Sequence, residues 1–310
     1  ESCQRQEGTT EGLKREGSNM NKVAIVTDSN SGITQEEAKR LGVYVLPMPF
    51  TMDEKEYFED ISLTQQQFYE CLENDTEIAT SQPSPEAVTG LWDQVLENYD
   101  EIVHIPMSSG LSGSCQTAMM LAEEYDGRVK VVNNQRISVT QRQSALDAKK
   151  LAEQGKTAAE IETILMDTKM ESDIYIMVDT LKYLKKGGRV TPAAAAIGEI
   201  LRIKPVLQIH GEKLDAFAKA RNMKAAKTMM VNAIKKDITD HLGEIPAADA
   251  ENAPWIAMAH TQNAETAEIW KEELAEEFPG YDIHIDPLSL SIACHIGPGA
   301  LALTWMKKIV

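Results

Sequence analysis

The serine-rich stretch 107–114, which reads MSSGLSGS, contains residue types well suited to binding an anion. Residues 101–106 before it form an apolar run typical of a buried strand, and apolar residues after it recur at helical spacing. The pattern predicts a strand, a turn rich in hydroxyl groups and the start of a helix. Unpaired amide groups and the positive end of a helix dipole favour an anion there. A simpler alternative is that Ser112 or Ser114 only caps the helix.

Two further segments carry side chains that could contact such an anion. Residues 79–85 contain two prolines and predict a rigid loop that presents Thr80 and Ser81. A plain turn with capping hydroxyls is the alternative for this segment. Residues 294–299, which read CHIGPG, predict a tight loop whose backbone would aim the imidazole of His295. A lone histidine is more often a surface or capping residue, so His295 needs support from other residues.

The sequence contains no standard motif for cofactor chemistry, namely GxGxxG, GxxxxGK[ST] or HExxH. Residues 110–114 also fail the GxSxG pattern of a nucleophile elbow, because Ser114 stands where the second glycine is needed. Catalytic partners meet in space rather than in sequence. A serine–histidine hydrolase or acyl transferase that acts on lipid esters through Ser112 and His295 therefore remains an alternative.

The overall composition restricts the class of protein. The chain has 310 residues, 43% hydrophobic and 25% charged, with a formal net charge of −17 at pH 7. This acidic balance argues against a nucleic-acid partner, and no apolar run approaches the roughly 20 residues of a membrane span. The cysteines are far apart, which predicts reduced thiols in a cytoplasmic protein without a disulfide framework or a zinc site. They are Cys3, Cys71, Cys115 and Cys294. We expect no other metal site and no cofactor, because the residues form no metal cluster and the cofactor motifs are absent.

Strands and helices alternate from Lys22 onward, which predicts an α/β fold with a largely parallel sheet in the first half. Ligands of such sheets bind beyond the carboxyl ends of the strands, where the loops after Thr27 and Met107 should both lie. We expect strands at 23–27, 43–50, 101–106, 129–132 and 174–178, and helices at 63–72 and 85–97. A long helical region should follow strand 129–132, with a break near 155–157, and end at residue 169.

The second half is expected to contain a short helix that ends at glycines 187 and 188, followed by a hairpin of strands 204–209 and 213–218. Further helices are expected at 225–242 and 264–278, and further strands at 255–260, 282–288 and 300–305. We predict a flexible leader over residues 1–19, an α/β domain over 20–170 and a second α/β domain over 171–310, with mainly parallel or mixed sheets.

Several short motifs together resemble the DegV family of bacterial fatty-acid-binding proteins, which includes the lipid-carrying subunit of bacterial fatty acid kinase. The resemblance extends over essentially residues 22–310. The motifs are TDSNS (27–31), TSQPS (80–84), SSGLSGS (108–114), LKKGGRV (184–190), IKPVL (203–207) and HIGPGAL (295–301). Residues 133–136 (NNQR) depart from the Asp-Ser that the family commonly has after the preceding strand.

The resemblance implies a protein that binds one long-chain fatty acid and has no catalytic activity of its own. The carboxylate would contact Thr80 and Ser112, with Ser81 and Ser109 as neighbours and His295 nearby, and the acyl chain would lie in an apolar tunnel. Each buried methylene group contributes about 0.8 kcal/mol, so a long chain would supply most of the affinity.

In the family's kinase system, which serves phospholipid metabolism, a separate ATP-binding kinase subunit phosphorylates the bound acid to an acyl phosphate. The resemblance implies that Arg189, Arg202 and Arg221 meet this subunit. A regulatory binding module for another amphiphile is a third alternative, and it would bind long-chain acids poorly.

Overall fold

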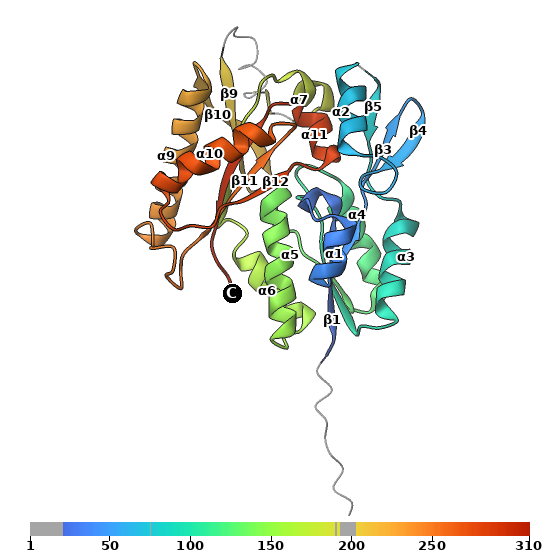
Figure 1. The fold of residues 1–310 in the computed structure, drawn as a ribbon. Coiled ribbons are helices and arrows are strands. Elements are labelled where there is room, and N and C mark those ends of the chain that lie inside the picture. Colours follow the sequence, from blue (N-terminus) through green and yellow to red (C-terminus); the bar gives the residue numbers. More distant parts are fainter. Residues whose placement is uncertain (1–20, 75, 190, 193–202) are drawn as a thin grey trace, which may run out of the picture.

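A computed structural model describes residues 21–74, 76–189, 191–192 and 203–310 (Figure 1). The expected leader 1–19 and Arg202 lie outside these described residues. In the described part of the chain, we find no helix long and apolar enough to cross a membrane.

The first sheet consists of four parallel strands in the spatial order β2-β1-β6-β7. These strands are β1 (Val23–Asp28), β2 (Tyr44–Leu46), β6 (Glu101–Ile105) and β7 (Val129–Val131). Because β1 and β6 are neighbours and parallel, the loops that follow them lie at the same edge, as the sequence predicts.

Helices cover both faces of the first sheet, because successive apolar residues of each strand point to opposite sides. On one face, Val23 and Ile25 pack in a cluster with the helices α1 (Gln35–Leu41), α5 (Ser138–Glu153) and α6 (Ala158–Asp167). On the other face, Ala24 and Val26 pack with α3 (Pro85–Leu96) and α4 (Ser114–Ala122), which the short turn η2 (Glu123–Tyr125) follows.

The second sheet has six strands in the order β10-β9-β8-β13-β11-β12 and is antiparallel except for the pair β11–β12. The strands are β8 (Ser172–Met177), β9 (Lys204–His210), β10 (Lys213–Ala220), β11 (Trp255–His260), β12 (His284–Pro287) and β13 (Leu301–Met306). Residues 204–220 form the expected hairpin.

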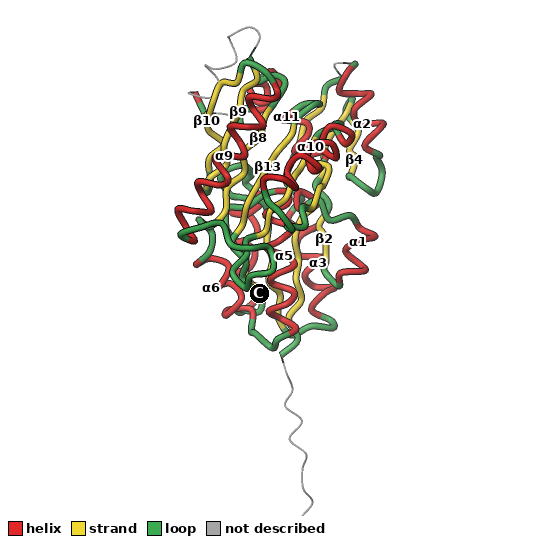
Figure 2. Tube along the Cα trace, turned by 60° about the vertical axis from the view of Figure 1, so that its left-hand side comes forward, coloured by secondary structure: helices red, strands yellow, loops and turns green. Residues whose placement is uncertain are grey.

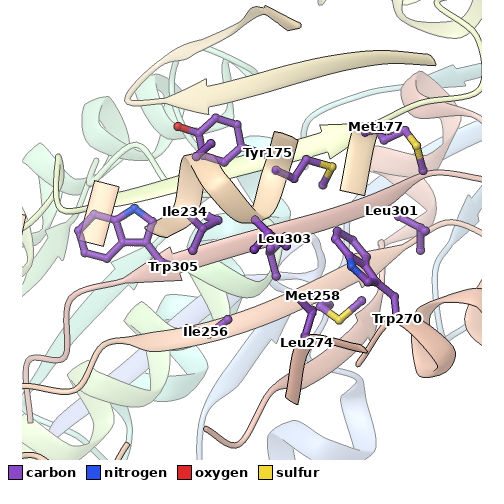
Figure 3. Close-up of a cluster of buried hydrophobic side chains, with 14 of the residues drawn as sticks. Tyr175, Met177, Ile234, Ile256, Met258, Trp270, Leu274, Leu301, Leu303 and Trp305 are labelled. Atoms are coloured by element: carbon purple, nitrogen blue, oxygen red, sulfur yellow. The ribbon is translucent and has the colours of Figure 1, made fainter. Parts of the chain in front are cut away.

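One face of the second sheet packs against α9 (Met223–Leu242) and α10 (Ala264–Glu277). Figure 3 shows this core, in which Trp270 and Leu274 of α10 lie over the β-strands, and Figure 2 shows the two helices from the side. The opposite face packs against residues of the first half, including Met107, Ile137 and Val139. The two halves of the chain therefore share a hydrophobic cluster.

A third, antiparallel sheet has the order β4-β3-β5 and lies beside the short helices that carry the candidate site. Its strands are β3 (Pro49–Met52), β4 (Lys55–Phe58) and β5 (Ile78–Thr80). The nearby helices are α2 (Gln65–Glu73), α7 (Lys182–Gly187) and α11 (Leu290–Ile296). Phe50 and Phe68 pack in one cluster with Leu290 and Ala293, which fixes α11 against this sheet.

The structure corrects the sequence analysis at three places. The expected strand 43–50 is divided between β2 and β3, which belong to different sheets. Thr80 is the last residue of β5 rather than part of a loop. Residues 294–296 are not a tight loop but the last turn of α11, which ends at Gly297. The division into domains at residue 170 falls between α6 and β8, and it stays a prediction.

Candidate functional site

A cavity of about 270 Å³, here called the main cavity, lies where the third sheet, α11, α7 and the loop after β6 meet. Its volume is close to the lower end of the usual range for small-molecule sites, about 300–1,000 Å³. Most of its wall is apolar and includes Met107, Leu111, Ile137, Leu184, Ile209 and Leu214. Its polar groups include Thr80, Ser81, Gln82, Ser112, Ser291 and His295. The cavity therefore combines an apolar body with a small set of hydrogen-bonding groups.

Thr80 and His295 form the central polar contact of the main cavity. The Oγ1 atom of Thr80 lies 2.9 Å from Nε2 of His295, and both side chains are partly buried. A neutral imidazole has one donor and one acceptor nitrogen. When Nε2 carries the proton, it donates to Thr80, and the threonine hydroxyl hydrogen is then available for a group in the cavity.

His295 stays neutral in this environment. Burial, with a contribution from the nearby Arg189 guanidinium, lowers its pKa to about 4. At neutral pH the imidazole therefore supplies a hydrogen bond and no charge. A carboxylate at this site would accept hydrogen bonds from hydroxyl groups such as that of Thr80, as an anion partly removed from water requires, and Arg189 is the cation in the lining.

Gly187 allows α7 to pack against the imidazole of His295. A Cβ atom at this position would lie 2.1 Å from Nδ1 of His295, which is too close for any side chain. At the end of α11, Gly297 has a φ of +80°, a conformation that glycine adopts readily. Gly187 of motif 184–190 and Gly297 of motif 295–301 thus together allow the observed position of His295.

Ser112 belongs to the loop between β6 and α4, and its hydroxyl is bonded within that loop. The hydroxyl donates to Oγ of Ser114 at 3.1 Å and accepts from the Ser114 amide at 3.2 Å. The capping alternative for Ser112 is therefore correct in part, although the residue also lines the main cavity. A hydroxyl has a single hydrogen, so Ser112 can donate to a ligand only when its hydroxyl rotates away from Ser114.

The end of β1 and the turn after it position the other two segments of the site. Asp28 is buried, and its Oδ2 accepts from the amide of Met107 at 2.8 Å, which holds the start of the serine-rich stretch. Burial raises the pKa of this carboxyl, although the donors from Met107, Gln141 and Asn30 act in the opposite direction. Asn30 lies in the short turn η1 (Ser29–Ser31), and its Oδ1 accepts from Ser289 before α11. The motif 27–31 therefore supports the site without lining the main cavity.

The remaining predicted site residues are in different places. Ser81 lines the main cavity, and its amide donates to Pro49. Ser109 does not line that cavity: its hydroxyl donates to Glu212 at 2.9 Å and accepts from Asn133 at 2.8 Å. Arg221 is exposed between β10 and α9 and also does not line it.

Arg189 lies at the site itself, and its guanidinium donates to the carbonyl of Gly187 at 2.5 Å. Sequence reasoning assigned it only to a partner interface. It also missed Gln82, which accepts from Thr117, and Ser291 of α11. Of these two residues, only Gln82 lies inside one of the sequence motifs, TSQPS (80–84), and could have been found from it.

Two alternative chemistries are not supported by the described residues. Ser112 is bonded to Ser114 and His295 to Thr80, so the Ser112–His295 pair of a hydrolase is not formed. Among the described side chains, no group of three or more His, Cys, Asp or Glu is placed to hold a metal ion.

Comparisons with known proteins agree on one family over nearly the whole chain. A family model described as "Uncharacterised protein, DegV family" matches residues 22–308. A DegV domain-containing protein of Listeria innocua is 30% identical over 290 residues, which cover 93% of this chain and 99% of that protein.

Solved structures give the same result. A DegV family protein from Thermus thermophilus, described as binding fatty acid, matches with a TM-score of 0.82 and 28% identity over 93% of this chain and 100% of that one. DegV of Bacillus subtilis, described as a fatty acid binding protein, matches with a TM-score of 0.80, 28% identity and the same coverage.

Proposed function

The chain belongs to the DegV family, and we propose that it binds one long-chain fatty acid in the main cavity. The carboxylate would accept hydrogen bonds from Thr80 and Ser112, with His295 bonded to Thr80. The observation that carries the proposal is the Thr80–His295 contact in a cavity whose wall is otherwise mostly apolar. The fatty acid binding described for the Thermus thermophilus and Bacillus subtilis proteins supports it.

The energetics of this proposal rest on the acyl chain. At about 0.8 kcal/mol for each buried methylene group, a palmitoyl chain contributes on the order of 10 kcal/mol before the cost of ordering. The polar residues contribute less to affinity, and they set the direction in which the acid enters. The hydroxyl donors would stabilise the carboxylate by hydrogen bonds, and the guanidinium of Arg189, which also lines the main cavity, supplies a positive charge nearby.

Mass spectrometry of an organic extract from freshly purified protein tests the ligand class. We expect about one long-chain fatty acid for each protein chain, and the extract would also rank the acids that the host supplies. An empty extract, followed by no binding of added palmitate or oleate, would contradict the proposal and would favour a module for another amphiphile.

We further propose that the chain is a non-catalytic carrier that presents the bound acid to a separate ATP-binding kinase subunit in the cytoplasm. The absence of a Ser112–His295 hydrogen bond supports a carrier over a hydrolase. The purified chain should not cleave p-nitrophenyl esters, and it should yield acyl phosphate only when the ATP-binding subunit and ATP are added. Ester cleavage that disappears in Ser112→Ala would instead support the hydrolase.

A further inference from the structure

Ser291 of α11 brings a hydroxyl group without a hydrogen-bond partner to the main cavity. The residue lines this cavity and is only 5% exposed. Among the described residues, none forms a hydrogen bond with its side chain. The hydroxyls of Thr80 and Ser112, which line the same cavity, are both bonded to other side chains. Ser291 is therefore a buried polar group that the protein itself does not satisfy.

The helical period places Ser291 on the face of α11 that borders the main cavity. Four of the seven residues of α11 line this cavity, namely Ser291, Ile292, His295 and Ile296. The other three pack in the cluster of the third sheet, namely Leu290, Ala293 and Cys294. At 3.6 residues per turn, these two sets occupy opposite faces of the helix. The Oγ atom of Ser291 is also not among the unpartnered polar atoms that protein encloses completely, so it faces the cavity.

The surroundings of this hydroxyl are apolar. Ser291 shares the cavity face of α11 with two isoleucines, and the same lining contains Met48. A hydroxyl that is removed from water without a partner costs about 1–3 kcal/mol in proteins. A saturated acyl chain has no polar atom along its length, so it would leave the Ser291 hydroxyl in this state. A hydroxyl on the ligand would be a suitable partner, since this group both donates and accepts.

The position of Ser291 on α11 indicates where such a group would lie on the ligand. Ser291 and His295 are four residues apart, which places their Cβ atoms about 5–6 Å from each other on one side of the helix. His295 is bonded to Thr80, the proposed carboxylate contact. A ligand hydroxyl that meets Ser291 would therefore be only a few carbon atoms from the carboxyl carbon.

We propose that the main cavity is adapted to a long-chain fatty acid with a hydroxyl group near its carboxyl end, and that this hydroxyl pairs with Ser291. The inference rests on the proposed fatty acid function and specifies the class of acid. Thr80 and Ser112 would hold the carboxylate as before, and the rest of the acyl chain would contact the apolar wall. The cavity then favours the hydroxy acid over the plain acid of equal length, because only the hydroxy acid leaves no buried hydroxyl unpaired.

The test measures dissociation constants of the full chain for three acids of equal length, palmitate, 3-hydroxyhexadecanoate and 16-hydroxyhexadecanoate. We expect wild type to bind the 3-hydroxy acid about fivefold more tightly than palmitate, the effect of one neutral hydrogen bond. The 16-hydroxy acid should show no such gain, because its hydroxyl is at the far end of the chain.

Ser291→Ala distinguishes a contact with the ligand hydroxyl from a structural role. Alanine favours a helix, so the variant should fold. It should bind the 3-hydroxy acid about tenfold more weakly, since the ligand hydroxyl is then buried without a partner. Palmitate should bind as well as to wild type or more tightly, because an unpaired hydroxyl has been removed. The control is Thr163→Val, which removes an exposed hydroxyl bonded to Ala159 on α6. It should leave the constants within about twofold of wild type.

Each other result has a definite meaning. Equal weakening of palmitate and the 3-hydroxy acid by Ser291→Ala would show that Ser291 contacts the carboxylate, and unchanged affinity for both would show that no ligand group meets it. Either result overturns the inference, as does tighter binding of the 16-hydroxy acid than of the 3-hydroxy acid by wild type. Failure of wild type to bind any of the three acids contradicts the proposed function. Binding of palmitate with weaker binding of the 3-hydroxy acid contradicts this inference alone.

Discussion

The side chains of Thr80 and His295, which are 215 positions apart in the chain, are joined by a hydrogen bond of 2.9 Å between Oγ1 and Nε2. Thr80 ends a strand of the third sheet, and His295 lies in the last turn of α11. The bond therefore connects elements from the two halves of the sequence at the wall of the main cavity. The proposed ligand contacts depend on this relationship.

Removal of either proposed carboxylate donor should weaken binding of palmitate. Thr80→Val keeps the shape of the side chain and removes the hydroxyl, and Ser112→Ala removes the second donor. Each change should raise the dissociation constant about tenfold, the size expected for a hydrogen bond to a charged group. Displacement of a fluorescent fatty acid measures this effect. Thr163→Val is the control, since its hydroxyl donates to Ala159 on α6 and does not line the main cavity. Unchanged affinity in both site variants would exclude this carboxylate site.

The close approach of Gly187 to His295 predicts a steric effect. In Gly187→Ala the new methyl group would lie 2.1 Å from Nδ1 of His295. We expect a loss of about 1–3 kcal/mol in the free energy of unfolding, as for other overpacked sites, together with weaker palmitate binding.

Gly90→Ala is a matched control for Gly187→Ala, because a Cβ atom at Gly90 of α3 has no neighbour within 4 Å. This change should be neutral or should stabilise the protein by up to about 1 kcal/mol, since alanine favours a helix interior. Urea denaturation and palmitate binding of both variants test the pair. Equal behaviour of the two would show that α7 can move away from α11 without cost.

Local sequence patterns predicted most helices and strands, but they predicted less well which residues meet at the candidate site. Short apolar runs located β1 and β6, and Pro85 located the first turn of α3, because these signals act within a few residues. The strand β5 was missed, since its three residues are too short for a pattern and pair only with the distant β3. His295 was assigned to the right motif but to the wrong element, because the glycines after it obscured the helix α11.

The roles of Ser109 and Arg189 show what sequence reasoning lacks. Both lie in motifs of the resemblance, yet Ser109 contacts Glu212 and Asn133, whereas Arg189 lines the main cavity. Which hydroxyl or guanidinium faces a cavity depends on contacts between residues far apart in the chain, and a single sequence does not contain that information. The partner roles of Arg189, Arg202 and Arg221 stay predictions.

Arg221 offers the clearest test of the proposed kinase partner, since it is exposed and does not line the main cavity. Arg221→Glu should leave palmitate binding unchanged and slow phosphorylation of bound palmitate by the ATP-binding subunit about tenfold, because a reversed charge at an interface opposes docking. The initial rate of acyl phosphate formation measures this. Arg40→Glu, an exposed charge reversal on α1, should have little effect. An unchanged rate for Arg221→Glu would remove Arg221 from the interface.

The buried carboxyl of Glu59 should make the protein less stable to unfolding as the pH rises. Its Oε1 accepts from the Leu290 amide at the start of α11 at 2.9 Å, and its Oε2 has no hydrogen-bond partner. Burial, with a smaller contribution from Asp60, raises its pKa from 4.5 to about 8. The native state then binds more protons than the unfolded state between these values, so stability decreases by about 2 kcal/mol from pH 6 to pH 8. In Glu59→Gln this decrease should be absent, as measured by urea denaturation at both pH values. A slope equal to that of wild type would assign it to other groups.

The buried imidazole of His104 should have the opposite effect, so that the protein becomes less stable to unfolding as the pH falls. It is buried on β6 with its ring 5.5 Å from that of Trp92, and neither ring nitrogen has a hydrogen-bond partner. Burial lowers its pKa from 6.5 to about 3. The unfolded chain therefore takes up a proton that the native state excludes, and stability should fall by about 2.5 kcal/mol from pH 7 to pH 4.5.

His104→Phe should remove this loss at low pH, because phenylalanine keeps the aromatic contact with Trp92 and has no group to protonate. At pH 7 the variant should be as stable as wild type or more stable, since two buried nitrogens without partners are removed. Urea denaturation at pH 7 and pH 4.5 measures both effects. Because Glu59 acts in the opposite direction, Glu59→Gln and His104→Phe control for each other: each should remove one slope and retain the other. If the His104→Phe variant loses as much stability between pH 7 and pH 4.5 as wild type does, then groups other than His104 cause the loss at low pH.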